Sequence, residues 1–147
     1  MVLTLTSEKL SEYKLDDIQI GQKKQFSVTV LGSMIDDFAK LSGDHSPIHV
    51  DETYANSTNF KKRICHGMLL ASFFSRLVGM YLPGKNALYF SQSLKFISPC
   101  FINDNIIIEG EVIEKSTSTR LITLKTTITN NTGNRLVDGE AKVLIRE

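Results

Sequence analysis

Residues His66 to Tyr81 read HGMLLASFFSRLVGMY, the longest run in the chain whose apolar side chains follow helical spacing. These apolar residues cover nearly every direction around the axis of a helix, and a helix that is apolar all round is buried. Pro83 and Gly84 stop the helical pattern directly after it. We therefore predict one central helix that the rest of the chain encloses.

The segments on both sides of this helix alternate apolar and polar residues, which is the pattern of half-buried strands. One such strand precedes the helix at residues 25–30, and four follow it, at residues 88–96, 106–112, 122–128 and 137–145. Turn residues separate the later strands, so neighbouring strands are expected to pair antiparallel. The pattern predicts an α+β fold of the hotdog type, in which an antiparallel sheet wraps around a central buried helix.

The insert between the first strand and the central helix is predicted to hold two short helices. The first follows Ser33 and ends at Gly43, and the second begins at Asp51, a good N-cap residue. No regular helix is expected over residues 44–50, because Pro47 lacks an N–H group and disfavours helical backbone at the residue before it.

The bulk properties describe an ordinary single domain. A chain of 147 residues suits one hotdog domain over residues 1–147, with residues 1–14 expected as a flexible N-terminal extension. A net charge of +1 favours neither nucleic acid nor a membrane as a partner. The sequence has no secretory signal pattern and no apolar run long enough to span a membrane. Cys65 and Cys100 are therefore expected to be free thiols in a soluble, cytoplasmic protein.

A polar loop after the first short helix carries the first candidate site. Asp44 and His49 lie five residues apart across a proline turn. A carboxylate and an imidazole that are held close together can share a water molecule and pass a proton. The alternative is that Asp44 only caps a turn and His49 is an ordinary histidine.

Gly67, at the start of the central helix, is the second candidate. A helix N-terminus presents unpaired N–H groups and a partial positive charge. Glycine at that point allows the carbonyl group of a ligand to approach the backbone closely. Such a donor can stabilise a developing oxyanion, although Gly67 could also serve packing alone.

Two other kinds of site would use the same region. Cys65 beside His66 suggests a nucleophile, but nothing in the sequence marks this cysteine as a reactive thiolate. A metal site built from Asp44 and the three histidines is the second, but Pro47 interrupts the helical spacing between two of them. We expect neither a nucleophilic cysteine nor a metal site here.

Residues Phe38 to His49 read FAKLSGDHSPIH, and this stretch resembles the signature of the MaoC-like, R-specific enoyl-thioester hydratases, also called hydratase 2. Residues 66–75 resemble the central helix of that family, and residues 83–85 and 91–96 resemble the segments that follow it. The resemblance covers about residues 15–147. It is closest to the members with one hotdog domain that supply (R)-3-hydroxyacyl-CoA for polyhydroxyalkanoate synthesis.

The resemblance implies reversible hydration of trans-2-enoyl-CoA to (R)-3-hydroxyacyl-CoA, without a cofactor, by a homodimer. It implies that Asp44 and His49 are the catalytic pair, that the Gly67 N–H forms the oxyanion hole, and that Ser75 supports the aspartate. Ser46 stands where the family usually has asparagine before the proline. Serine donates from a shorter arm and with one group rather than two, which weakens the expected support of this loop.

The run Lys61, Lys62 and Arg63 lies just before the central helix. These side chains are placed to meet the phosphates of an acyl-CoA or of a phosphopantetheine carrier, or else they form a solvated basic loop.

Three other functions remain open. A 3-hydroxyacyl-carrier-protein dehydratase of fatty-acid synthesis would perform the same chemistry on an acyl-carrier-protein thioester. A thioesterase of the same fold is a weaker alternative, because the spacing of Asp44 and His49 matches the hydratases. The third is an acyl-thioester binding module without catalytic activity.

Overall fold

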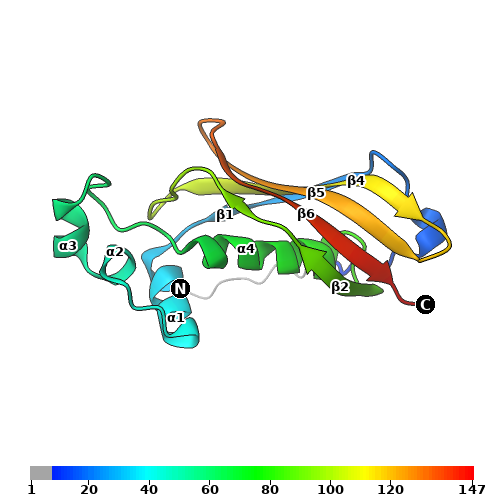
Figure 1. Ribbon diagram of the computed structural model, residues 1–147, viewed down its shortest axis with the longest axis horizontal. Helices are drawn as coiled ribbons and strands as arrows, with labels where there is room; N and C mark the ends of the chain where they lie inside the picture. Colours follow the sequence, from blue (N-terminus) through cyan, green and yellow to red (C-terminus); the bar gives the residue numbers. More distant parts are fainter. Residues whose placement is uncertain (1–7) are drawn as a thin grey trace.

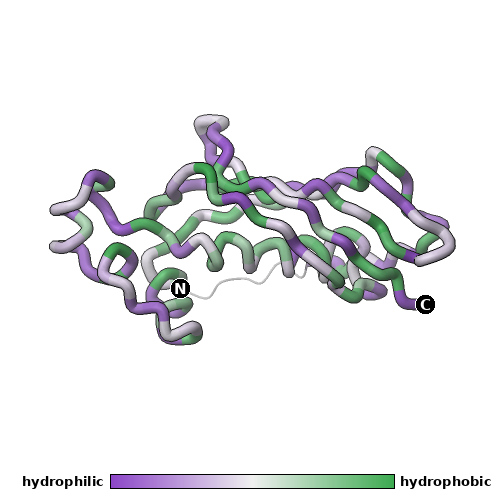
Figure 2. Tube along the Cα trace, viewed as in Figure 1, coloured by the Kyte–Doolittle hydropathy of each residue, from purple (hydrophilic) through white to green (hydrophobic). Residues whose placement is uncertain are grey.

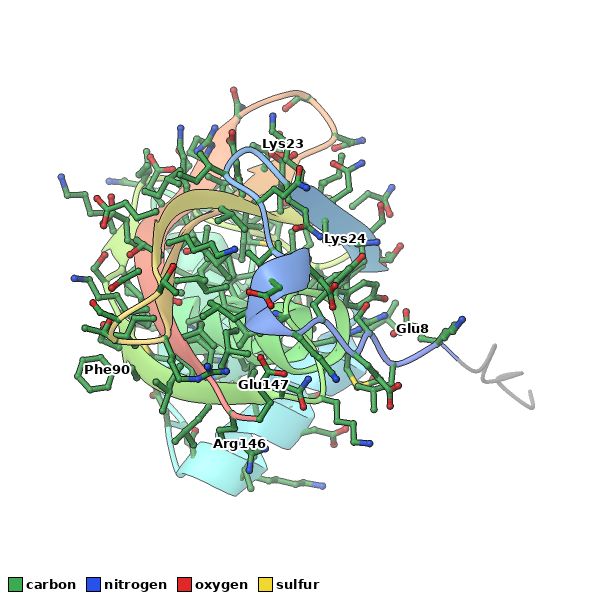
Figure 3. All side chains as sticks on the ribbon, turned by 90° about the vertical axis from the view of Figure 1, so that its right-hand side faces the viewer. Glu8, Lys23, Lys24, Phe90, Arg146 and Glu147 are labelled. Carbon is green, nitrogen blue, oxygen red and sulfur yellow. The ribbon has the colours of Figure 1, made fainter. Side chains whose placement is uncertain are left out.

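A six-stranded antiparallel sheet curls around one long helix (Figure 1). The computed structural model describes residues 8–147. The strands follow the order β1-β4-β5-β6-β2 across the sheet, and the short β3 pairs with β6. Their bounds are β1 (Lys23–Thr29), β2 (Ala87–Gln92), β3 (Lys95–Phe96), β4 (Asn105–Ser116), β5 (Leu121–Asn130) and β6 (Arg135–Ile145). Seen from its end, the molecule shows the sheet wrapped around the helix (Figure 3).

The central helix α4 (Gly67–Arg76) continues as a π-helical segment, η2 (Leu77–Tyr81). The insert forms three helices at one end of the molecule (Figure 1), namely α1 (Gly32–Ser42), α2 (Pro47–Val50) and α3 (Glu52–Ser57). One turn of 3-10 helix, η1 (Leu15–Asp17), lies at the opposite end (Figure 1). The predicted α+β fold, with an antiparallel sheet around a central helix, is confirmed. Within residues 8–147, no helix is long and apolar enough to cross a membrane.

The core forms where the inner face of the sheet meets α4 and η2. Ile106 and Ile108 of β4 are fully buried and alternate with more exposed residues, as a strand with one inner face requires. Phe74 and Leu77 supply the helical side of the same core. A Cβ atom at Gly110 would lie 2.8 Å from the Leu77 side chain. The glycine on β4 therefore allows the end of the helix to pack directly on the strand.

One stripe of the helix is left open by the sheet. The exposed residues Met68, Ser72, Ser75 and Gly79 follow each other at intervals of three or four positions. They therefore share one face of the helix. Figure 2 shows apolar colouring along much of α4, which runs below the sheet in that view. The predicted burial holds for the side that faces the sheet, whereas this stripe faces outward in a single chain.

The strand predicted over residues 88–96 is divided into β2 and β3. The pairing register shifts between Tyr89 and Ser91, and β2 forms one edge of the sheet. Leu88 and Phe90 are 51% and 70% exposed, and Phe90 points away from the body of the molecule (Figure 3). The prediction of one continuous strand is wrong because Ser93 and Leu94 belong to neither strand. The prediction of an inner apolar face fails because alternation does not reveal the bulge within β2.

The expected absence of helix over residues 44–50 is also corrected. Residues Pro47 to Val50 form the single turn α2, with Pro47 at its first position. Proline is tolerated there because the first N–H groups of a helix have no partner within the helix. The rule used in the prediction applies to the interior of a helix and not to its first turn.

The predicted N-terminal extension is packed against the domain in the part that the structure describes. The Ser11 N–H donates to Met80 O (2.9 Å), and the Ser11 carbonyl accepts from the Lys85 N–H (2.8 Å). Gly84 has φ +88°, and a Cβ atom there would lie 2.0 Å from Ser11 O. The described part of this extension is therefore tied to the domain at Ser11, and residues 1–7 lie outside the described residues.

Candidate active site

The loop between α1 and α2 holds the Asp44 carboxylate through its own main chain. Gly43 ends α1 in the left-handed conformation, with φ 83°, and the Asp44 N–H then donates to Ser42 Oγ at 3.1 Å. The Ser46 N–H donates to Asp44 Oδ1 at 3.1 Å. The contact from position 46 to Asp44 is thus made by the backbone, which any residue except proline supplies.

His49 lies on α2 with its ring orientation fixed by a main-chain carbonyl. Its Nδ1 atom is 2.8 Å from Ile64 O. Because a carbonyl oxygen only accepts, Nδ1 carries the proton and Nε2 of the neutral ring keeps its lone pair. Nε2 lies 4.0 Å from Asp44 Oδ2, and the side chains of His49 and Asp44 are 13% and 51% exposed. This separation is too long for a direct hydrogen bond and suits one bridging water.

Arg63 supports His49 rather than facing solvent. Its Nε–H donates to His49 O at 2.5 Å, and its guanidinium pairs with Asp36 of α1. Only 12% of the Arg63 side chain is exposed, so it is not available for a substrate phosphate, and this expectation is revised. Lys61 and Lys62 are exposed. They remain the candidates from that run.

Gly67 is the first residue of α4, so its N–H group has no hydrogen-bond acceptor within the helix. His66 O accepts from the Leu69 and Leu70 N–H groups, whereas no bond of the Gly67 N–H is present within residues 8–147. A Cβ atom at position 67 would lie 2.9 Å from the Phe96 ring. A larger residue here would displace the Phe96 ring, whereas glycine leaves a free donor beside that ring.

One cavity joins these residues. It has a volume of about 450 Å³ and is lined by Asp44, His49 and Gly67 at the polar groups. The apolar part of its lining includes Phe60, Ile64, Met68, Leu70, Phe96 and Ile97. A mainly apolar cavity with a few convergent polar groups is the usual form of a small-molecule site.

His66 also lines this cavity, and its role was missed from the sequence. The residue is 2% exposed. Its Nε2 lies 2.9 Å from Asp44 O, and its ring stacks on His49 with 3.9 Å between centroids. Burial lowers the pKa of His66 below the ordinary histidine value of 6.5, and the nearby His49 acts in the same direction. The only signal in the sequence was a histidine directly before the glycine that begins the helix.

The fold and the site have counterparts among known proteins. The family model described as "MaoC like domain" matches residues 17–134. This chain belongs to the MaoC-like family. It is 41% identical to the (R)-specific enoyl-CoA hydratase of Aeromonas caviae over 86% of this chain and 94% of the relative. It is 39% identical to the (R)-specific enoyl-CoA hydratase of Rhodospirillum rubrum, over 96% and 97% of the two chains. The solved R-hydratase PhaJ1 of Pseudomonas aeruginosa superposes with a TM-score of 0.90 at 33% identity, covering 94% of this chain and 88% of that one.

Ser75 does not meet Asp44 within this MaoC-like chain. It is exposed on the open stripe of α4. It lies eight positions after Gly67, which is roughly 12 Å along a helix. None of the hydrogen bonds of the Asp44 carboxylate in the described residues involves Ser75. The expected support of the aspartate by this serine is therefore not seen within one chain.

The two alternative chemistries fit the MaoC-like site poorly. A hydrogen bond with Cys100 and burial raise the pKa of the Cys65 thiol, which opposes thiolate formation. Asp44, His49 and His66 place one candidate metal-ligand atom each within 4.8 Å of one another. However, the two imidazoles are stacked with 24° between their planes. Ring lone pairs lie in those planes and do not converge on one ion, so the cluster is a poor metal site.

Proposed function

We propose that this protein hydrates trans-2-enoyl-CoA to (R)-3-hydroxyacyl-CoA and catalyses the reverse dehydration. The observation that carries the proposal is the 4.0 Å gap between Asp44 Oδ2 and His49 Nε2, which opens on the cavity shared with Gly67. The identity to two curated (R)-specific enoyl-CoA hydratases over most of both chains supports the same activity. The reaction needs one activated water, one proton for carbon and one donor for an oxyanion, and the site offers a group for each.

In the proposed mechanism, Asp44 and His49 hold one water between them. The oxygen of this water forms a bond to C3 of the enoyl thioester, and C2 receives a proton. Asp44 and His49 together take a proton from the water and mediate the proton transfers, while the C2–C3 double bond becomes a single bond. Negative charge develops on the thioester oxygen, and the Gly67 N–H donates to it.

The substrate is proposed to enter with its acyl chain against the apolar lining of the cavity. Phe96, which lies against Gly67, would cover the thioester and reduce its contact with water. Lys61 and Lys62 are exposed on the segment before the cavity, and we assign to them the phosphates of CoA. A phosphopantetheine arm carries a phosphate too, so an acyl-carrier-protein substrate is the alternative.

The working form is proposed to be a homodimer. The open stripe of Met68, Ser72, Ser75 and Gly79 consists mostly of small residues on an otherwise apolar helix, and such a face suits close packing with another helix. The neighbouring edge strand β2 exposes Leu88 and Phe90, and an edge strand with unpaired main-chain groups invites pairing with a second copy. Any contact between Ser75 and an active site would then be made across the interface.

Sedimentation tests the dimer directly. Phe90→Glu should shift the protein toward monomer, because it places a charge on the exposed edge. Ile20→Glu is the matched control, since Ile20 is similarly exposed, at 68% against 70%, but lies outside the stripe and β2. A monomeric wild-type protein with full activity would contradict this assembly.

The activity is tested on crotonyl-CoA by following two signals in the same reaction. Hydration removes the enoyl absorbance without releasing a thiol, whereas a thioesterase releases free CoA. Comparison with crotonyl-acyl-carrier-protein then distinguishes the two carriers by kcat/KM. If the folded protein gives neither signal, a binding module without catalytic activity is the function that remains.

We also propose a cytoplasmic location, since Cys65 and Cys100 are both buried thiols.

A further inference from the structure

His66 contacts both members of the proposed catalytic pair, Asp44 and His49. It is the N-cap of α4, directly before Gly67. Its Nε2–H donates to the main-chain oxygen of Asp44 at 2.9 Å. Its ring stacks on the ring of His49, with centroids 3.9 Å apart and 24° between planes. One side chain thus links the oxyanion-hole residue with both members of the catalytic pair.

Phe38 also restrains the ring of His66. Phe38 of α1 meets it edge-on, with centroids 4.8 Å apart and 60° between planes. With 2% of the residue exposed, the imidazole has little room to change rotamer. Phe38, His66 and His49 form a column of rings that runs from α1 past the start of α4 to α2.

The bond from His66 to Asp44 O ties the Asp44 loop to the start of α4. The bonds to Ser42 and Ser46 orient Asp44 inside its own loop. His49 is fixed separately, because Ile64 O holds its ring and Arg63 holds its carbonyl. Loss of the His66 bond would therefore free Asp44 to move relative to His49 and would change the gap between them.

Packing alone does not explain why a side chain with a second ring nitrogen stands at position 66. Because Asp44 O only accepts, Nε2 carries the proton and Nδ1 has the lone pair. Nδ1 is buried and has no hydrogen-bond partner among residues 8–147. An unpaired buried acceptor destabilises a fold, and an apolar side chain of similar shape would avoid that penalty. Histidine at this position is therefore better explained by its Nε2–H donor.

We propose that His66 is a positioning residue, which fixes Asp44 relative to His49 and to the Gly67 N–H through its Nε2–H bond, while its ring packs between Phe38 and His49. This inference rests on the proposed hydratase function, because its effect appears in turnover. It does not make His66 a catalytic residue, since no step of the proposed reaction uses its nitrogen atoms.

Two amide variants separate the bond from the ring. His66→Gln places an amide donor near the position of Nε2, whereas His66→Asn places one near Nδ1, too short to reach Asp44 O. Both variants lose the stacked ring, so the difference between them reports the bond. We expect His66→Gln to keep kcat within about fivefold of wild type, while kcat of His66→Asn falls roughly 10- to 100-fold. KM for crotonyl-CoA should change less than threefold in both.

His45→Gln is the control, since His45 is exposed on the same loop, and it should match wild type. Equal losses in the two His66 variants, no loss in either, or a loss confined to KM would overturn the positioning role. Melting temperatures of both variants are measured in parallel, and a loss of kcat that follows the melting temperature alone would also overturn it.

An independent measurement does not depend on activity. Nitrogen-15 NMR of the histidine rings in the wild-type protein should find His66 protonated on Nε2 at neutral pH. Protonation on Nδ1 would contradict the bond to Asp44 O even if a variant fails to fold. Wild-type protein without hydratase activity would overturn the proposed function, and the NMR result would still decide the hydrogen bond.

Discussion

Asp44 Oδ2 and His49 Nε2 face each other across 4.0 Å, and separate elements hold them at that distance. Asp44 is fixed by the turn after α1 and by the ring of His66. His49 is fixed from the segment before α4, through Ile64 O and Arg63. The gap is therefore a property of the assembled fold, and it accommodates a single water between a carboxylate and an imidazole.

Replacing Asp44 with asparagine should remove most of the hydratase rate. The change keeps the volume of the side chain but removes the carboxylate that binds and polarises the water in the proposed mechanism, and such groups contribute typically 10²- to 10⁴-fold. We expect kcat on crotonyl-CoA to fall by about 10²-fold or more with a nearly unchanged melting temperature. Near-normal turnover by the folded variant would show that Asp44 is not catalytic.

His49→Ala combined with Asp44→Asn tests whether the two residues act on one water. Residues that serve a single step give losses that are far from additive. The double variant should therefore be only slightly slower than the slower single variant, measured as kcat/KM. Losses that multiply would indicate that the two side chains serve separate steps.

Substitutions in the basic run Lys61 to Arg63 should have two different effects. Lys61→Ala with Lys62→Ala removes exposed charges, each worth about 0.2–1 kcal/mol. It should raise KM for crotonyl-CoA by about two- to tenfold and leave the KM of a crotonyl-pantetheine thioester unchanged. Arg63→Gln should instead lower kcat on both substrates, because Arg63 holds His49 O and Asp36. Equal effects of the lysine changes on the two substrates would contradict their role at the CoA phosphates.

Stability should fall as the pH is lowered past the ordinary pKa of histidine. Burial lowers the pKa of His66 in the folded chain below 6.5. From about pH 6.5 downward, the unfolded chain therefore binds a proton at this histidine that the folded chain does not bind. The free energy of unfolding then drops as pH falls from 6.5 to the lowered pKa, by at most about 1.4 kcal/mol per pH unit from this group. Urea unfolding between pH 7.5 and 5 measures the slope. His66→Gln should flatten it, while His45→Gln should not, and equal slopes in all three proteins would contradict a buried neutral His66.

The fold was largely predictable because its main signals are local. The apolar run 66–81, alternation in the later strands and Gly43 at a helix end each reflect a rule within a few residues. The parts of the fold prediction that were wrong depend on finer geometry. The bulge after Tyr89 leaves no mark in an alternating pattern, and Pro47 fits the first turn of a helix although it would break the middle of one.

Asp44, His49 and Gly67 line one cavity, as the resemblance implies, and their catalytic roles stay a prediction. The contacts that hold these residues in place were not predicted. The contacts of Arg63 with Asp36 and of His66 with Asp44 join residues 27 and 22 positions apart. Such contacts depend on how helices meet in three dimensions, so a single sequence gives no periodic signal for them.

The stereochemistry of crotonyl-CoA hydration tests the central claim most directly. The product is offered separately to dehydrogenases specific for (R)- and for (S)-3-hydroxyacyl-CoA, in reactions with wild-type protein and with the Asp44→Asn variant. We predict that wild-type protein forms (R)-3-hydroxybutyryl-CoA and that the variant forms very little product. Formation of the (S) product would contradict (R)-specific hydration, and equal formation of the (R) product by the variant would contradict delivery of the water by Asp44.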